Sequence, residues 1–228
     1  MSFSARGRML FGFVLANIAI IAVASAVYIT RPPSPPQIQG VLLSEANPLP
    51  GFRLLDQNGD TFTNRNLLGR WHLVSYGFTT CPDICPTTLS EVSTAVAQLG
   101  DGADDLRVLF YTVDHRRDTV SQLAGYLPFF NEEFLGLTHL DDPDNPHLPF
   151  EQGLGIVARL VPDPDPGSSD YQVVHGVTLF LLNPRGELQA IFEPGNVGLG
   201  VRSYNPDKLA ADYRAVRQYL AREALPAG

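Results

Sequence analysis

Cys81 and Cys85 are the only two cysteines in the chain of 228 residues, and three residues separate them. Two thiols in one turn can close and reopen a disulfide, or they can supply two thiolate ligands to a soft metal ion. They cannot supply the four ligands of a structural zinc site. A disulfide across so short a loop would restrict the unfolded chain little, so we expect a functional pair.

An apolar stretch without charges, residues 10–29, lies near the N-terminus and is long enough to cross a bilayer as a helix. Arg6 and Arg8 precede it, and Arg31 is the only basic residue between it and Arg53. The positive-inside rule therefore predicts a single-pass inner-membrane anchor, with residues 1–9 in the cytoplasm and the domain in the periplasm or an equivalent extracytoplasmic space. The alternative, a signal peptide cleaved at the small residues 24–26, would export the same domain.

Residues 30–50 begin with a run of prolines and are predicted to be a semi-rigid linker. Residues 51–228 have the length of one domain. The net charge of −8 argues against a nucleic-acid-binding surface. In an oxidising compartment a cysteine pair closes unless a reductant or a metal ion protects it, so we expect a thiol reductant or a metal to act on this pair.

The apolar pattern of the domain predicts strands that alternate with helices. We expect a hairpin over 52–63 that turns at Asn-Gly, strands at 71–78, 106–113 and 134–140, helices at 86–99 and 119–127, a second hairpin over 178–192 and a final helix from 205. This order predicts an α/β, thioredoxin-like fold: a central mixed sheet flanked by helices, with an N-terminal β-hairpin and a preceding transmembrane helix.

This arrangement predicts that Cys85 lies at a helix N-terminus, where the helix dipole would lower the pKa of its thiol. Asp118 is expected to cap the helix that follows it. Asp114, at the end of a strand near the cysteines, could equally be structural or bind a partner. Asp83, between the cysteines, could tune the charge of the site or bond to its own loop.

Three segments together resemble the Sco/SenC family of membrane-anchored copper chaperones, which act in cytochrome c oxidase assembly and have a thioredoxin fold. They are residues 76–89 (YGFTTCPDICPTTL), 113–119 (VDHRRDT) and 171–175 (YQVVH). The first is similar to the family's copper-binding CxxxCP signature. The resemblance implies that Cys81, Cys85 and His175 bind copper, as Cu(I), Cu(II) or both. It implies as partners the copper-receiving (CuA) subunit of the oxidase and, further, other copper chaperones or a thiol reductant.

The chain departs from the family pattern at three positions. His115 stands where proline is usual, and Val174 and Gly176 flank His175 where the family usually has an aspartate and a serine or threonine. The missing polar neighbours are expected to weaken the metal site, because such groups orient a ligating imidazole. A carboxylate at position 174 is therefore expected to tighten copper binding if that position faces the site.

Two functions remain open from the residues. The first is a metallochaperone. The second is a thiol-disulfide oxidoreductase that reduces the cysteines of a copper-receiving partner, with Cys81 and Cys85 as its redox pair and the more exposed thiol as nucleophile. The other four histidines have no spacing typical of a metal site and are interpreted as ordinary surface or strand residues: His72, His115, His139 and His147.

Overall fold

The structure is a computed structural model that describes residues 5–29, 34–139, 147–162, 171–196 and 202–224. Its contacts divide the chain into two units, one of residues 1–35 with 218–228 and one of residues 36–217. Residues 1–4 of the predicted cytoplasmic segment and 30–33 of the predicted linker lie outside the described residues.

The first unit contains helix α1 (Ala5–Ile29), which includes the stretch predicted to be the anchor. Large apolar side chains along this helix are exposed: Met9, Leu10, Phe11, Phe13, Val14, Leu15, Ile18, Ile20, Ile21 and Val23. No helix among the described residues meets the length and apolarity required of a membrane span. The transmembrane anchor over 10–29 therefore stays a prediction.

The second unit is built on an eight-stranded mixed sheet with the order β1-β10-β9-β4-β5-β6-β2-β3. Three parallel strands form its centre: β4 (Trp71–Gly77), β5 (Leu106–Thr112) and β6 (Leu135–Thr138). The flanking strands pair antiparallel: β9 (Leu179–Leu182), β10 (Glu187–Phe192) and β1 (Gly40–Pro48) on one side, β2 (Arg53–Asp56) and β3 (Thr61–Thr63) on the other. The predicted mixed sheet and both hairpins are confirmed.

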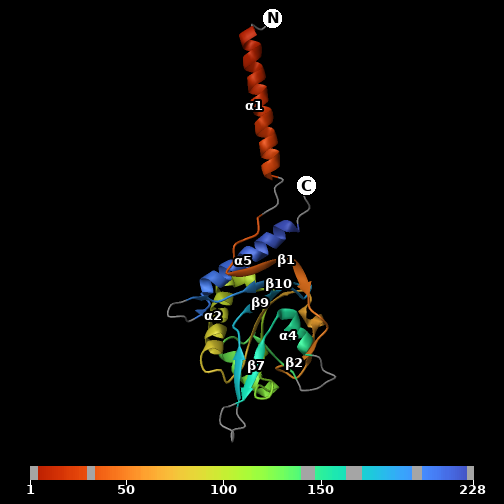
Figure 1. Cartoon of the computed structure of the whole chain (residues 1–228), viewed down its shortest axis with the longest axis vertical. Coiled ribbons are helices and arrows are strands. Elements are labelled where there is room, and N and C mark those ends of the chain that lie inside the picture. The colour runs from red at the N-terminus through yellow and green to blue at the C-terminus, as the bar shows by residue number, and fades with distance from the viewer. Residues whose placement is uncertain (1–4, 30–33, 140–146, 163–170, 197–201, 225–228) are drawn as a thin grey trace. The chain divides into compact units, whose positions relative to one another are not determined.

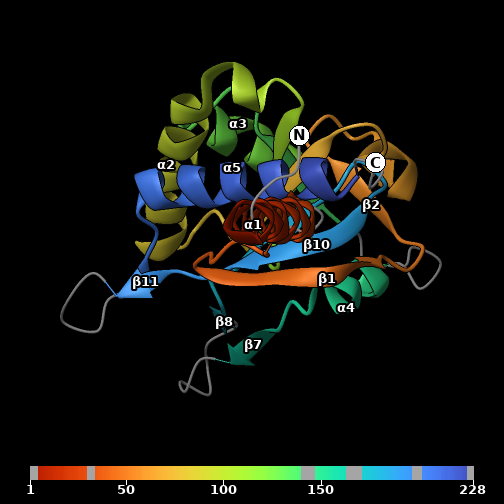
Figure 2. The same cartoon turned by 90° about the horizontal axis from the view of Figure 1, so that it is seen from above.

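Helices cover both faces of this sheet (Figure 2). On one face lie α2 (Ile84–Leu99), α3 (Val120–Tyr126) and α5 (Pro206–Glu223); on the other lie α4 (Leu148–Leu154) and a two-stranded arm of β7 (Ala158–Pro162) and β8 (Tyr171–His175). The arm extends from the body of the domain (Figure 1). Short pieces complete the chain: 3₁₀ turns at Asn64–Leu67, Gly100–Ala103 and Leu127–Phe129, and the pair β11 (Gly195–Asn196) and β12 (Arg202–Ser203).

Strand β4 explains why the cysteine loop is held firmly. All seven of its residues are buried, because a central strand in a sheet covered on both faces meets no solvent. Its side chains alternate between the two faces, so that Leu73 packs toward α2 and α5 while Val74 and Tyr76 join the core cluster on the face of α4. The chain therefore leaves β4 at a fixed point and enters the loop that carries both cysteines.

Three features of the domain differ from the sequence-based expectations. Residues 40–48, expected in the linker, form β1 and pair with β10, so the linker is shorter than predicted. Helix α2 begins at Ile84, two residues before the expected start. The arm of β7 and β8 and helix α4 were not predicted, because their sequences are short and the arm is stabilised by pairing between its own strands.

Candidate metal centre

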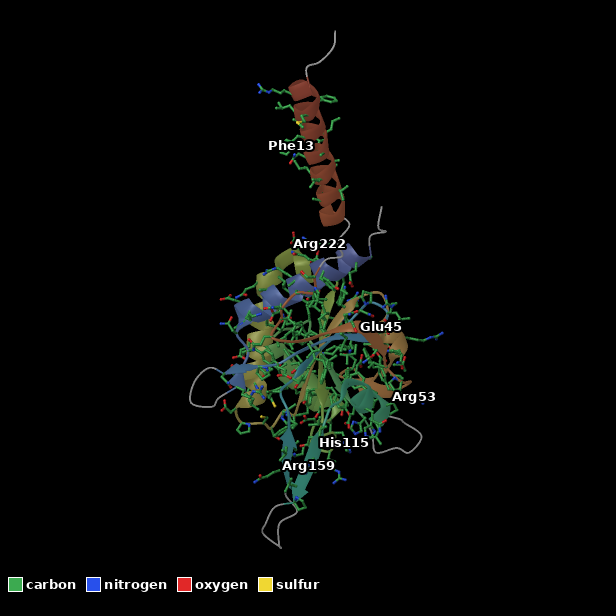
Figure 3. All side chains as sticks on the ribbon, turned by 45° about the horizontal axis from the view of Figure 1, so that its top comes forward. Phe13, Glu45, Arg53, His115, Arg159 and Arg222 are labelled. Atoms are coloured by element: carbon green, nitrogen blue, oxygen red, sulfur yellow. The ribbon has the colours of Figure 1, made fainter. Side chains whose placement is uncertain are left out.

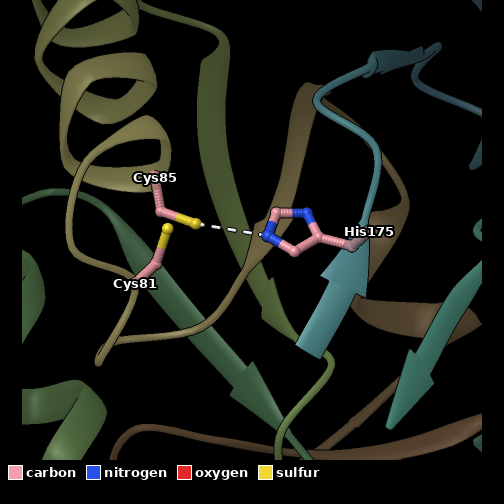
Figure 4. A group of neighbouring side chains, drawn as sticks. All are labelled: Cys81, Cys85 and His175. Atoms are coloured by element: carbon pink, nitrogen blue, oxygen red, sulfur yellow. Dashed lines mark hydrogen bonds between the residues drawn. The ribbon is translucent and has the colours of Figure 1, made fainter. Parts of the chain in front are cut away.

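Cys81, Cys85 and His175 come together at the end of the sheet where β4 delivers the chain (Figure 4). One ligand atom of each residue lies within 4.8 Å of the others, and this is the one such group of three or more histidine, cysteine or acidic side chains in the described part of the chain. Both cysteines are free thiols. They are 8% and 4% exposed, while His175 is partly buried. The three residues that the family resemblance singled out are therefore neighbours in space.

The two cysteines reach the site from the loop after β4 and from the first turn of α2. Gly77 ends β4, and a Cβ atom added there would lie 2.6 Å from the Cys85 sulfur, so only glycine lets the strand pass so close to the thiol. Phe78, Cys81 and Cys85 form a small buried cluster against which Ile84 and Val173 pack. This packing keeps solvent from the sulfurs.

Asp118 holds the cysteine loop in place. The backbone N–H and the hydroxyl of Thr79 donate to its carboxylate over 2.8 and 2.6 Å, and the Thr112 hydroxyl donates over 2.6 Å. Burial raises the pKa of Asp118, against the three hydrogen bonds, which lower it. The expected role as a helix cap is wrong: Thr119 is the N-cap of α3 and accepts from the Gln122 amide.

Replacing Asp118 by alanine is expected to destabilise the fold by about 3 kcal/mol, because the buried Thr112 hydroxyl and the two partly buried donors of Thr79 would lose their acceptor. Chemical denaturation of the metal-free protein measures this. Asp83→Ala is the matched control, since Asp83 is exposed and makes no capping hydrogen bond; it should change stability by less than about 0.5 kcal/mol. Equal effects of the two substitutions would show that Asp118 does not fasten the loop.

The third ligand residue, His175, is the last residue of β8, whose alternation sends Tyr171, Val173 and His175 to the face of the cysteine loop. The Tyr171 hydroxyl donates to Asp114 over 2.5 Å, and Arg117 forms a salt bridge with the same carboxylate. Asp114 is completely buried, so it fastens the start of β8 to the end of β5. Of its two predicted roles, the structure supports the structural one.

The imidazole of His175 has a fixed orientation. Its Nδ1 lies 2.5 Å from the carbonyl oxygen of Gly176, and its Nε2 lies 3.4 Å from the Cys85 sulfur. Because a carbonyl only accepts, we assign the proton to Nδ1, which leaves the Nε2 lone pair facing the thiols. The rings of Tyr76 and Phe78 meet the imidazole edge to face, with centroids 5.7 and 5.5 Å away.

The pKa of the Cys85 thiol in the metal-free site differs from the expectation based on its position at a helix N-terminus. Burial raises the pKa of the Cys85 thiol, and a hydrogen bond with Cys81 adds to the rise, so the predicted lowering at the helix N-terminus is wrong. Burial also lowers the pKa of His175, against the hydrogen bond to Gly176, which raises it. Without a metal Cys85 and His175 are therefore both neutral near pH 7, and the Cys85 sulfur lies 3.4 Å from the unprotonated Nε2. A bound cation would reverse this balance by stabilising the thiolate.

The structure accounts for both departures next to His175. Val174 is 49% exposed and points away from the face that carries His175, so a carboxylate there would not reach the imidazole. The Gly176 carbonyl already supplies the hydrogen bond that orients the ring. The expected weakening and the expected benefit of an aspartate at 174 are thus not supported by this geometry.

The other four histidines lie outside the ligand group. His72 is a buried residue of strand β4, which agrees with its interpretation as a strand residue, whereas the buried His139 belongs to a stack of three histidines that the sequence did not indicate. The rings of His139 and His147 stack with centroids 3.6 Å apart, and His115 follows at 4.1 Å. With Arg159 they line a hollow beside the arm; Figure 3 labels two of these residues, His115 and Arg159. No spacing in the sequence indicates this stack, because its members come from three different segments.

Sequence reasoning also missed the residues that support the ligands. Tyr76 and Phe78 flank the imidazole, and Tyr171 and Arg117 fasten β8. All four lie inside the three segments that carried the family resemblance. The signal was therefore present, but only the fold shows which supporting residue touches which ligand.

The geometry defines a thioredoxin-like α/β domain that brings two cysteines and one histidine together at the end of its sheet. A sequence model of the SCO1/SenC family matches residues 43–199. This match covers more than half of the chain, and the chain belongs to the SCO1/SenC family.

Relatives and solved structures agree with this assignment. The "SCO2-like protein" of Rickettsia conorii is 37% identical over 130 residues, which are 55% of this chain and 63% of that protein, so the match spans less than two thirds of it. The structure of Bradyrhizobium japonicum ScoI with copper bound has 31% identity and a TM-score of 0.59, over 75% of this chain and 99% of that one. Yeast Sco1 with copper bound has 29% identity and a TM-score of 0.59, over 74% and 89%. The predicted thioredoxin-like fold is confirmed.

Proposed function

We propose that this protein is a copper metallochaperone that holds one copper ion through Cys81, Cys85 and His175. The observation that carries the proposal is the convergence of two free thiols and an imidazole nitrogen within 4.8 Å of one another. Family membership and the copper-bound structures of ScoI and Sco1 support copper as the ion.

The donor atoms fit copper in both oxidation states. Thiolates are soft ligands that suit Cu(I), while imidazole also suits Cu(II). Three protein ligands leave a coordination position into which a ligand of the recipient can enter, and an ion held in this way can be passed on. The burial of both thiols protects the pair from solvent before loading.

The recipient we propose is the copper-receiving subunit of cytochrome c oxidase, at its CuA site, with other copper chaperones or a thiol reductant as further partners. Membership of the family supports this partner.

We propose further that residues 10–29 anchor the chain in the inner membrane, with the domain in the periplasm. The uncharged apolar run and the preceding Arg6 and Arg8 support this placement. Extraction of the full chain from membranes by alkaline carbonate would contradict it; retention is expected.

The second candidate is a thiol-disulfide oxidoreductase. The observation that favours it is the pair of free thiols close enough to share one site, with Cys81 the more exposed and hence the attacking sulfur. The low exposure of both sulfurs opposes it, because exchange requires direct approach by the partner's disulfide.

One substitution separates the two functions. His175→Ala is expected to weaken copper binding by roughly 100-fold, because it removes a ligand, while exchange with a model disulfide stays within about threefold, since exchange needs only the sulfurs. Copper content and chelator competition are measured on the anaerobically purified domain, with His147→Ala as a matched control. Wild-type protein that takes up no copper, or takes up zinc that copper cannot displace, would overturn the proposal.

A further inference from the structure

The short connection after His175 orients the imidazole ring through its backbone. Residues 176–178 join β8 to β9, and the carbonyl of Gly176 holds Nδ1 of the imidazole. The position of this one carbonyl therefore decides which ring nitrogen faces the sulfurs. Whatever fixes the backbone at Gly176 also fixes the ligand.

Tyr76 lies directly against this point. It is 7% exposed on β4, and its ring packs between His175 and Phe180, with centroids 5.7 and 5.9 Å away. Its hydroxyl meets hydrogen-bonding groups of the same connection, the backbone of Gly176 and the backbone and side chain of Thr178. The buried phenol of Tyr76 therefore packs against the connection and supports its backbone.

The space around Gly176 is shaped by that hydroxyl. A Cβ atom at position 176 would lie 2.6 Å from the Tyr76 hydroxyl oxygen, too close for any real contact, whereas the next ring atom is 3.8 Å away. Gly176 is not among the glycines with a positive φ, so its backbone conformation does not demand glycine. The hydroxyl of Tyr76 is what excludes a side chain here.

We propose that Tyr76 is a positioning residue for His175: its hydroxyl holds the backbone of Gly176, and Gly176 must lack a side chain for that contact to form. The inference rests on the proposed role of His175 as a copper ligand. It deepens that role by naming a group outside the three proposed ligands that orients the imidazole ring.

The close approach of the Tyr76 hydroxyl to position 176 predicts a particular pattern in a double-mutant cycle. Tyr76→Phe removes only the hydroxyl and should weaken copper binding roughly tenfold, the lower range for groups that orient a metal ligand. Gly176→Ala should weaken it at least as much, because the new Cβ atom would meet the hydroxyl of the buried Tyr76 and displace the backbone of the connection. In the double variant the new methyl group meets only the ring carbon at ordinary distance, so Gly176→Ala should add no further loss.

Tyr111→Phe is the matched control. Tyr111 is the register partner of Tyr76 on β5 and is also buried, but its hydroxyl bonds to Glu151 and lies beside His139, away from the ligand connection. It should lower the melting temperature without changing copper affinity or the copper spectrum. Losses for Tyr76→Phe and Gly176→Ala that multiply, or an unchanged affinity and spectrum in Tyr76→Phe, would overturn the proposal.

A second measurement needs no metal. The ¹⁵N chemical shifts of the His175 ring in the metal-free protein report which nitrogen carries the proton. The wild type should show the Nδ1–H form, and Tyr76→Phe a mixture of both forms. If wild-type protein binds no copper, the proposed function fails while this test still decides the role of Tyr76; if copper binds and the ring of Tyr76→Phe is unchanged, only the role of Tyr76 fails.

Discussion

Replacing either Cys81 or Cys85 by serine is expected to lower copper affinity about a thousand-fold. A site of this type is held by roughly 12 kcal/mol, and each thiolate ligand carries about a third of that, or about 4 kcal/mol. A serine hydroxyl stays protonated and is a hard ligand, so it does not replace a thiolate for a soft ion. Each single variant should lose nearly as much as the double variant, because an isolated thiol with one imidazole forms no comparable site.

Chelator competition with anaerobically loaded protein measures this loss, and circular dichroism of the metal-free forms shows whether the fold is kept. Thr87→Ser, in the first turns of the same helix, is a matched control that keeps both sulfurs and should bind like the wild type. A single serine variant that retains copper within tenfold of the wild type would show that the two sulfurs do not act on one ion.

Copper affinity is expected to rise at least roughly tenfold for each pH unit between pH 6 and 8, since the ion must displace the proton of a thiol. The raised pKa of Cys85 means that its sulfur is still protonated throughout this range. Raising the pH lowers the proton concentration that competes with the metal, so the sign is an increase. His175 adds little to this slope, because burial lowers its pKa and the ring is already neutral near pH 7.

Affinity measured at three pH values, together with protons counted by an indicator dye during loading, gives the slope and the number released. Cys85→Ser should release at least one proton fewer than the wild type during copper loading. Asp83→Ala, which changes an exposed neighbour, should release the same number as the wild type. An affinity independent of pH would mean that the sulfur is already ionised in the free protein.

The sequence predicted the parts of the domain that depend on local pattern. The apolar run of β4, the Asn-Gly turn and the helix α2 that begins beside Cys85 are each indicated by a pattern within about fifteen residues, and all three are present. Strand β1 was missed because it follows a proline-rich run and is mostly exposed; its pairing with β10 comes from the other end of the chain.

The candidate metal site could likewise be predicted only where a local pattern in the sequence indicated it. Cys81 and Cys85 could be recognised from spacing alone, but His175 lies 90 residues after Cys85 and could be proposed only through the family resemblance. The raised pKa of Cys85 could not be foreseen, because helix position favours the thiolate while burial, which only the packing of Phe78 and Val173 reveals, outweighs it. The close approach of the Tyr76 hydroxyl to position 176 likewise could not be predicted, because the two residues come together only in the folded domain.

X-ray absorption spectroscopy of the copper-loaded, anaerobically prepared domain tests the central claim most directly, because it identifies the atoms bound to the ion. The wild type should show two sulfur neighbours and one imidazole nitrogen, and His175→Ala should lose the imidazole while keeping both sulfurs. A first coordination shell of nitrogen and oxygen alone, or one unchanged by His175→Ala, would contradict binding by Cys81, Cys85 and His175.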